Sequence, residues 1–263
     1  MERRVARQNL SFWVWPLVLV IAGILLLLRN YLLLDFDVWR LWPLVLIVLG
    51  GQIALTGDLG NRAAQSFRVS RGSVEAATLQ ASSGDVDIHL NALEGQEGRL
   101  IAGQYTANSR PELATQGNRA IITMQRGKTW FLSLADWEID LATDLPWEIL
   151  ASTYFGEISG DLRGLIIDRA HFATGFGDIR LITPDRPAGP LVFRSTLGNI
   201  HLTVPANMEA SLTIQAGPLF TVKIEDSRWR SDGNRRYVTA GYTGAIEPLE
   251  LIVGGTFGGL TLS

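Results

Sequence analysis

One apolar cassette occurs twice near the N-terminus and constrains the chain more than any other feature. The stretch Trp15 to Gly23, Trp-Pro followed by an aliphatic run, returns 27 residues later as Trp42 to Gly50. As a helix, the first apolar run (10–28) would span about 28 Å, close to the ~30 Å hydrocarbon core of a bilayer. Because a backbone in lipid must satisfy its own hydrogen bonds, we predict a two-helix transmembrane hairpin over residues 10–56, after a basic tail at 1–9.

Aromatic and basic side chains at the starts of both runs suit the headgroup level of a membrane. They are Trp13, Trp15, Trp39, Arg40 and Trp42. A cleaved signal peptide is the alternative for the first run, but no small-residue cleavage site follows Leu28 and a second copy of the cassette comes directly after. Arginines before the first run and after the second outnumber those in the link between them. The positive-inside rule therefore predicts that both termini of the chain lie in the cytoplasm and that the link lies outside.

The pattern changes after a polar segment, 57–72, which we interpret as a linker. From residue 73 onward apolar and polar residues alternate, for example over 74–80, 86–90, 120–124 and 137–141. Alternation with a period of two is typical of half-buried strands, and no long amphipathic helix is indicated. We therefore predict an all-β domain over residues 73–263.

A second internal repeat organises this β region. Glycines followed two residues later by isoleucine occur at Gly156, Gly177 and Gly198, spaced by 21 residues, and Gly84 and Gly258 mark further copies. A unit this short cannot bury its apolar face alone, so successive units are expected to stack as rungs and share a core. The glycines would provide turns with a φ that other residues avoid, and the isoleucines would point inward. A β-sandwich with regular hairpins is the alternative.

Equal spacing would also place Glu157, Asp178 and Asn199 in one column. Paired carboxylates could act on sugars, but Asp and Asn are common turn residues and the calcium-binding repeat pattern is absent. His89 and His201 share their repeat position with Arg180, which indicates a solvent-facing site and not a catalytic base. We predict no catalytic residue, no metal site and no cofactor.

Composition excludes other classes of function. The net charge is −3 and no basic stripe occurs, which argues against a nucleic-acid partner. The chain has no cysteine, so disulfides, thiolate metal sites and cysteine nucleophiles are excluded. His171 has neither a serine-glycine elbow nor metal-spaced partners.

Two aromatic features remain. One basic patch is a candidate for contact with anionic lipid headgroups, or else the solvated tip of a hairpin: Arg228, Trp229, Arg230, Arg235 and Arg236. Trp130, Trp137 and Trp147 could form a binding face for sugar or peptide, although we interpret them as caps on an open end of the stack.

These motifs resemble a known bacterial family. The Trp-Pro cassettes are similar to the LiaI/LiaF-type transmembrane module, and residues 147–222 resemble the C-terminal β domain of LiaF-like proteins and related toast-rack domains. The chain departs from some relatives in having only two convincing membrane helices. The resemblance implies a bacterial inner-membrane location and a role in the cell-envelope stress response, through restraint of a membrane sensor kinase or as a scaffold.

We therefore expect a membrane-anchored, non-enzymatic interaction protein. Its expected partners are the lipid bilayer, a sensor kinase or another envelope protein, and further copies of itself. The alternatives are a self-assembling structural β-repeat protein of the envelope and a glycan-active enzyme.

Overall fold

The computed structural model describes residues 43, 64–93, 95, 98–106, 109–126, 136–243 and 248–263. The chain divides into two compact units, 1–56 and 57–263. Of the first unit only Pro43 is described, and its backbone is helical. Apart from Pro43, the predicted hairpin therefore lies outside the described residues, as do its interface residues Trp13, Trp15, Trp39, Arg40 and Trp42. Within the described part of the chain, no helix is long and apolar enough to cross a bilayer.

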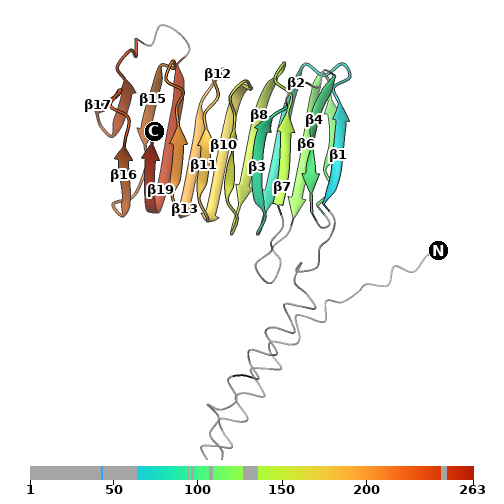
Figure 1. Cartoon of the computed structure of the whole chain (residues 1–263), viewed down its shortest axis with the longest axis horizontal. Coiled ribbons are helices and arrows are strands. Elements are labelled where there is room, and N and C mark those ends of the chain that lie inside the picture. Colours follow the sequence, from blue (N-terminus) through green and yellow to red (C-terminus); the bar gives the residue numbers. More distant parts are fainter. Residues whose placement is uncertain are drawn as a thin grey trace, which may run out of the picture. The chain divides into compact units, whose positions relative to one another are not determined.

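The second unit is built from strands, as the alternation predicted. Figure 1 shows them side by side along the domain. Their bounds are β1 Gln65–Ser70, β2 Ala76–Ser83, β3 Asp87–Ala92, β4 Arg99–Tyr105, β5 Glu112–Gln116, β6 Arg119–Arg126, β7 Asp136–Leu141, β8 Pro146–Thr153, β9 Ile158–Asp161, β10 Ile166–Phe176, β11 Ile179–Ile182, β12 Arg186–Pro187, β13 Leu191–Leu197, β14 Ile200–Thr203, β15 Ala210–Ile214, β16 Phe220–Ile224, β17 Trp229–Gly233, β18 Arg236–Thr239 and β19 Leu249–Leu262.

Two ladders of strands enclose the core. The first ladder runs β1-β4-β7-β3-β9-β11-β14-β19-β16. The second runs β5-β6-β2-β8-β10-β13-β19-β15-β18-β17. The long strand β19 belongs to both. At several places a strand of the second ladder passes through a corner into a strand of the first, as β8 passes into β9. We call each such pair one rung, and we count β6 with β7 as a rung because they pair with β2 and β3.

The rungs are in parallel register, which confirms the predicted stack. Ile158 pairs with Ile88 on one side and Ile179 on the other, and the row continues through Ile200 to Leu260. All five side chains are buried. In most strands the period-two pattern places one face in the space between the two ladders, where stacked rungs bury it; the edge strand β5 is exposed throughout. The domain is thus all-β with stacked strands.

The spatial order of the rungs departs from the sequence order at two places. The β2–β3 rung lies between the β6–β7 and β8–β9 rungs. The C-terminal strand β19 inserts between the β13–β14 rung and the β15–β16 rung. The expectation that every copy stacks on the preceding one is therefore wrong for β15–β16, because Phe220 pairs with Gly258 of β19.

Two of the tryptophans that were predicted to cap the stack lie inside it. Trp137 and Trp147 are fully buried, and their indole N–H groups donate to Ser109 Oγ and to the carbonyl oxygen of Ala142, each at 2.8 Å. The structure thus contradicts both interpretations of these residues, as end caps and as a binding face. Burial between two ladders with a satisfied N–H is the ordinary place for a large aromatic ring. Trp130 lies outside the described residues.

The predicted linker, 57–72, contains a strand. β1, Gln65–Ser70, pairs antiparallel with β4 and extends the first ladder by one edge strand. Phe67 and Val69, both partly buried, pack against the core. The sheet therefore begins eight residues earlier than the sequence analysis placed it. Two apolar residues flanked by arginine and serine are too short an alternation to stand out from a polar tether.

Candidate functional site

The repeat glycines form a column at the edge where the second ladder turns into the first, which we call the glycine corner. A Cβ atom on Gly177 would lie 2.1 Å from the carbonyl oxygen of Gly156, and one on Gly198 would lie 2.1 Å from that of Gly177. Gly258 stands in the same relation to Gly198, since β19 is the next rung. Glycine is needed at Gly156, Gly177 and Gly198 because the rungs approach closely. Of the column only Gly258 has a positive φ, so the predicted turn φ was the wrong reason for the others.

Gly84 does not belong to this column. Ile158 pairs with Ile88, so the position equivalent to Gly156 is occupied by Val86, whose carbonyl oxygen lies 2.1 Å from a Cβ built on Gly156. The predicted copy at Gly84 is therefore offset by two residues. A shift of two residues leaves the same side chains facing the core. The sequence alone therefore cannot distinguish the register that aligns Val86 with Ile158 from the one that aligns Ile88 with it.

The acidic column exists, and its carboxylates are used to join rungs. Asp87 Oδ1 accepts the backbone N–H of Glu157 at 2.7 Å, and Asp178 Oδ1 accepts that of Asn199 at 2.8 Å. The Arg180 guanidinium lies 2.6 Å from the Glu157 carboxylate and 2.8 Å from that of Asp178. The column is thus a structural ladder of charge-assisted hydrogen bonds and not a pair of carboxylates facing a cleft. Among the described residues, no group of three or more metal-ligating side chains is placed to hold an ion.

Two of the histidines lie in the row of paired residues that contains Arg180. His201 pairs with Arg180 across the ladder, and His89 Nδ1 lies 2.6 Å from Ser159 Oγ in the same row. His171 lies in β10 beside a shallow cavity of about 300 Å³. Burial, and secondarily the charge of Arg194, lower the pKa of His171 below its ordinary value, so its imidazole is neutral at pH 7.

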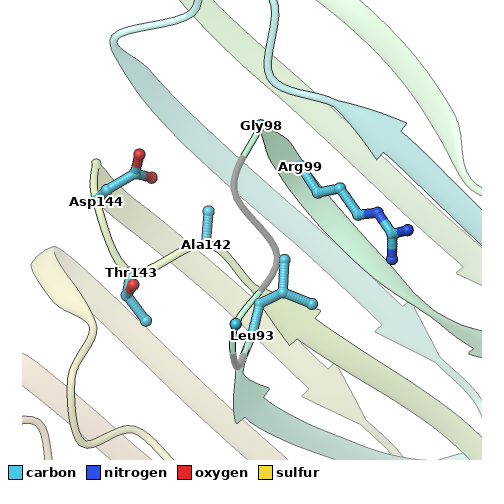
Figure 2. A pocket seen from close by; sticks show the side chains of 7 residues that line it. Leu93, Gly98, Arg99, Ala142, Thr143 and Asp144 are labelled. Carbon is cyan, nitrogen blue, oxygen red and sulfur yellow. The ribbon is translucent and has the colours of Figure 1, made fainter.

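A second cavity, of about 400 Å³, opens at the edge opposite the glycine corner, between Leu93 and Thr143. Figure 2 shows that the Arg99 side chain points away from Asp144. Asp144 is paired with Arg71. Polar groups that converge on one point are the mark of a binding pocket, and here Arg99 and Asp144 do not converge, so we assign no ligand site to this cavity.

The structure does not bring the five residues of the predicted basic patch together. Trp229 is buried. Arg228 directly precedes β17, and Arg235 lies in the turn that follows the other end of this strand. Arg235 donates to the Ala216 carbonyl oxygen at 2.6 Å, and Arg236 lies over the Tyr242 ring, 5.6 Å from its centroid. Arg230 is exposed on β17. The hairpin tip is the two-residue turn Asn234-Arg235, directly after Asp232 and Gly233 at the end of β17. Lipid contact by the arginines of this hairpin stays a prediction.

Arg228 has a structural task that the sequence did not reveal. Its guanidinium donates to the carbonyl oxygens of Val204 at 3.1 Å and Ala206 at 2.7 Å, and it pairs with Asp226 at 2.6 Å. These contacts fasten the β17–β18 hairpin to the segment after β14. They show why a basic residue beside a buried tryptophan need not be part of a surface patch.

We expect Arg228→Gln to lower the free energy of unfolding by about 2 kcal/mol, because several charged hydrogen bonds are lost and carbonyl groups are left unpaired. Arg230→Gln, on the same strand but exposed, should be neutral. Chemical denaturation followed by far-UV circular dichroism measures both. Equal midpoints for the two variants would contradict the structural role of Arg228.

Asp226 should report the same contact through its titration. Hydrogen bonds from the Arg228 side chain, and then from its backbone N–H, lower the pKa of Asp226 below its ordinary value near 3.8. The stabilisation by this carboxylate is therefore complete above pH 3.8 and is lost as the pH falls through the folded-state pKa. We expect Arg228→Gln to move the carboxyl titration of Asp226 upward, as measured by carbon-detected nuclear magnetic resonance. An unchanged titration of Asp226 in the Arg228→Gln variant would contradict this contact.

An exposed apolar row along the glycine corner is the feature that sequence analysis missed. We define this apolar ridge by six side chains and their exposed fractions: Tyr154 (40%), Phe155 (49%), Phe176 (42%), Leu197 (43%), Leu219 (62%) and Phe257 (43%). Phe176, Leu197 and Phe257 occupy one register position in successive rungs. The Phe155 and Phe176 rings stack at 5.2 Å, and the Tyr154 ring meets both edge-on. The available signal was a phenylalanine or leucine directly before each of Gly156, Gly177, Gly198 and Gly258.

Comparison with known proteins places the N-terminal part of the chain. Residues 13–53 match the family model of the LiaI-LiaF-like transmembrane region. The chain thus carries the LiaI-LiaF-like region that its Trp-Pro cassettes predicted, and this region indicates a membrane protein. The match lies within the predicted hairpin, 10–56, and ends before the β domain. No curated protein matches the chain.

Solved structures resemble the β domain. A "putative cell adhesion protein" from Clostridium sporogenes superimposes with a TM-score of 0.67 at 18% identity, over 76% of this chain and 98% of that one. A "putative adhesin" from Bacteroides fragilis aligns over 76% of this chain and 96% of that one, at 7% identity and a TM-score of 0.22. The first likeness supports the fold, a toast-rack-like stack, and the second is too low to carry an argument.

Proposed function

We propose that this chain is a membrane-anchored, non-enzymatic regulator or scaffold of the bacterial cell-envelope stress response. The observation that carries the proposal is the LiaI-LiaF-like region at residues 13–53 joined to a stacked β domain. The LiaI-LiaF-like region would meet partner helices, such as those of a sensor kinase, and the β domain would present binding surfaces. The anchor belongs to the bacterial inner membrane in this proposal.

The state of the acidic column supports binding over turnover. Glu157 and Asp178 are the best-placed carboxylates for chemistry on a sugar, and both are committed to Arg180. A general acid needs a protonated carboxyl at neutral pH, which usually requires a pKa raised by burial in an apolar site. Glu157 and Asp178 are partly exposed and ion-paired with Arg180, so neither lies in an apolar site.

The test is a stress reporter in cells that lack the chain. We expect deletion to change the reporter's response to a cell-wall-active antibiotic, and the full chain to restore it. A chain whose residues 10–56 are replaced by an unrelated two-helix hairpin should fail to restore it. Glu157→Gln combined with Asp178→Asn should restore it fully, because the change removes charge and not a catalyst. An unchanged response after deletion would refute the regulatory role, and failure of the folded carboxamide variant would favour a glycan-active enzyme.

The proposed topology has two spans and both termini in the cytoplasm. A reporter enzyme fused after Ser263 tests it directly, since some reporters are active only on one side of the membrane. We expect activity of a cytoplasmic reporter and none of an exported one. The reverse result would place the β domain outside and change which partners are accessible.

A further inference from the structure

The apolar ridge is the most concentrated apolar surface of the β domain. Nine large apolar side chains are exposed in the described part of the chain, and six of them belong to this row. Single exposed apolar residues are normal, but a contiguous row marks a contact surface. At about 4.8 Å per rung, the row from Phe155 to Leu219 extends about 19 Å along the corner.

The chain enters the β domain at the edge that carries this row. Gln65, the first residue of β1, pairs with Tyr105, and Tyr105 pairs with Trp137. Trp137 pairs with Ile88, which lies opposite Ile158. Along the strand direction, Gln65 is therefore level with Ile158, although β1 lies four strands away from β9 in the first ladder. β1 begins on the side of the β domain that carries the glycine corner and not on the opposite side.

Little chain separates this edge from the LiaI-LiaF-like region. The family match ends at residue 53 and β1 begins at Gln65, which leaves eleven residues, 54–64. Even a fully extended chain of that length spans only about 40 Å. A short tether keeps the corner at a high effective concentration beside the bilayer, so a modest apolar surface is sufficient for contact.

The charges along the corner favour apolar insertion over electrostatic attraction. The acidic groups next to the ridge are engaged: Asp87 and Asp178 accept backbone N–H groups of the neighbouring rungs. Arg180 is bound to Glu157 and Asp178, so it is not a free cation for lipid phosphates. Tyr, Phe and Leu are residues that settle at the boundary between headgroups and acyl chains.

We propose that the apolar ridge docks on the bilayer surface and inserts its side chains at the headgroup–acyl boundary, which holds the glycine corner against the membrane. The proposal rests on the membrane anchoring proposed above and adds a second, non-covalent contact to it. The ligand is the lipid surface itself. Contact depends on apolar burial and not on anionic lipid.

The absence of native cysteine allows single-site labelling of the full chain. An environment-sensitive fluorophore is attached to Leu197→Cys on the ridge, or to Leu113→Cys on edge strand β5 as a matched control, since Leu113 is 50% exposed. Both proteins are reconstituted into phosphatidylcholine vesicles with and without lipids that carry a shallow spin-label quencher. We expect a blue shift and loss of most of the emission at residue 197, and neither at residue 113.

A second variant separates insertion from a local effect of the label. Phe155→Ser, Phe176→Ser and Phe257→Ser are combined in a chain labelled at Leu219→Cys, and far-UV circular dichroism verifies that the strands remain. We expect the three serines to abolish quenching at residue 219. Persistence of the quenching would overturn the proposal.

Other outcomes identify other occupants of the ridge. Shielding that survives in detergent and disappears on dilution of the protein would indicate a second copy of the chain and overturn lipid docking. Quenching that requires phosphatidylglycerol and is lost in high salt would indicate electrostatic docking and likewise overturn it. Failure of docking with an intact stress-reporter response would leave the proposed function standing, so the two results are distinguishable.

Discussion

Alanine at Gly177 is expected to prevent stable folding of the β domain. The added Cβ would lie 2.1 Å from the Gly156 carbonyl oxygen, and that oxygen belongs to backbone fixed by the parallel ladders on both sides. A side chain could rotate away from such a clash, but backbone can move only if the rungs separate. Overpacking usually costs 1–3 kcal/mol, and because the obstacle here is backbone we expect a loss of about 4 kcal/mol or more.

Gly241 provides the matched control. It also lacks a positive φ, and no atom lies within 4 Å of a Cβ built on it. Gly241→Ala should therefore leave the unfolding midpoint unchanged or raise it slightly. Chemical denaturation of the full chain in detergent, monitored by the strand signal in far-UV circular dichroism, compares the two. A Gly177→Ala protein as stable as Gly241→Ala would mean that the rungs are not this closely stacked.

The repeat explains why so much of the fold is predictable from sequence. Inward isoleucines at Ile158, Ile179 and Ile200 recur with the glycines at one spacing, so strand register follows once the units stack. Each unit has the same local sequence pattern. Because the pattern recurs at a fixed spacing, it predicts which residues of neighbouring units pair, although those residues are far apart in the sequence. The same argument correctly placed Glu157, Asp178 and Asn199 in a column.

What the repeat could not indicate was the order of the rungs in space. Nothing in β19 says that it lies between the β13–β14 and β15–β16 rungs, because any rung presents the same type of apolar face. The offset at Gly84 has a related cause, since the pairing of Ile158 with Ile88 puts Val86 and not Gly84 opposite Gly156, and the local pattern does not show this.

The candidate surfaces were predictable only where side-chain exposure follows from strand alternation. Phe155 and Phe176 occupy corner positions, where the period of two is interrupted, so their exposure was not evident. Arg228 and Trp229 form a basic, aromatic pair in sequence, yet one fastens the hairpin and the other is in the core. Composition identifies the chemistry of such residues but not the direction in which they point.

Removal of β19 is the second change from which we expect a large effect. A chain that ends at Pro248 lacks the strand that pairs with β13 and β14 on one side and with β15 and β16 on the other. Among the described strands, β16 has no other ladder partner, and β15 retains only β18. Since each rung of a stack is stabilised chiefly by its neighbours, we expect the β15–β16 rung and the β17–β18 hairpin to unfold.

Hydrogen exchange measured by mass spectrometry can follow this loss along the chain. We expect peptides covering 210–224 to lose nearly all protection, those covering 191–203 to lose part of it, and those covering 76–92 to keep it. A synthetic peptide of residues 249–263 should restore protection when added, because the gap left between the two rungs matches that strand on both ladders.

The pattern of protection also distinguishes two kinds of stack. If the rungs fold as one cooperative block, truncation at Pro248 will expose 76–92 together with 210–224. If stability is a sum of nearest-neighbour terms, the damage will fade with each rung away from the missing strand. Unaltered protection at 210–224 would contradict the insertion of β19 itself, because no other described strand could then hold β16 in place.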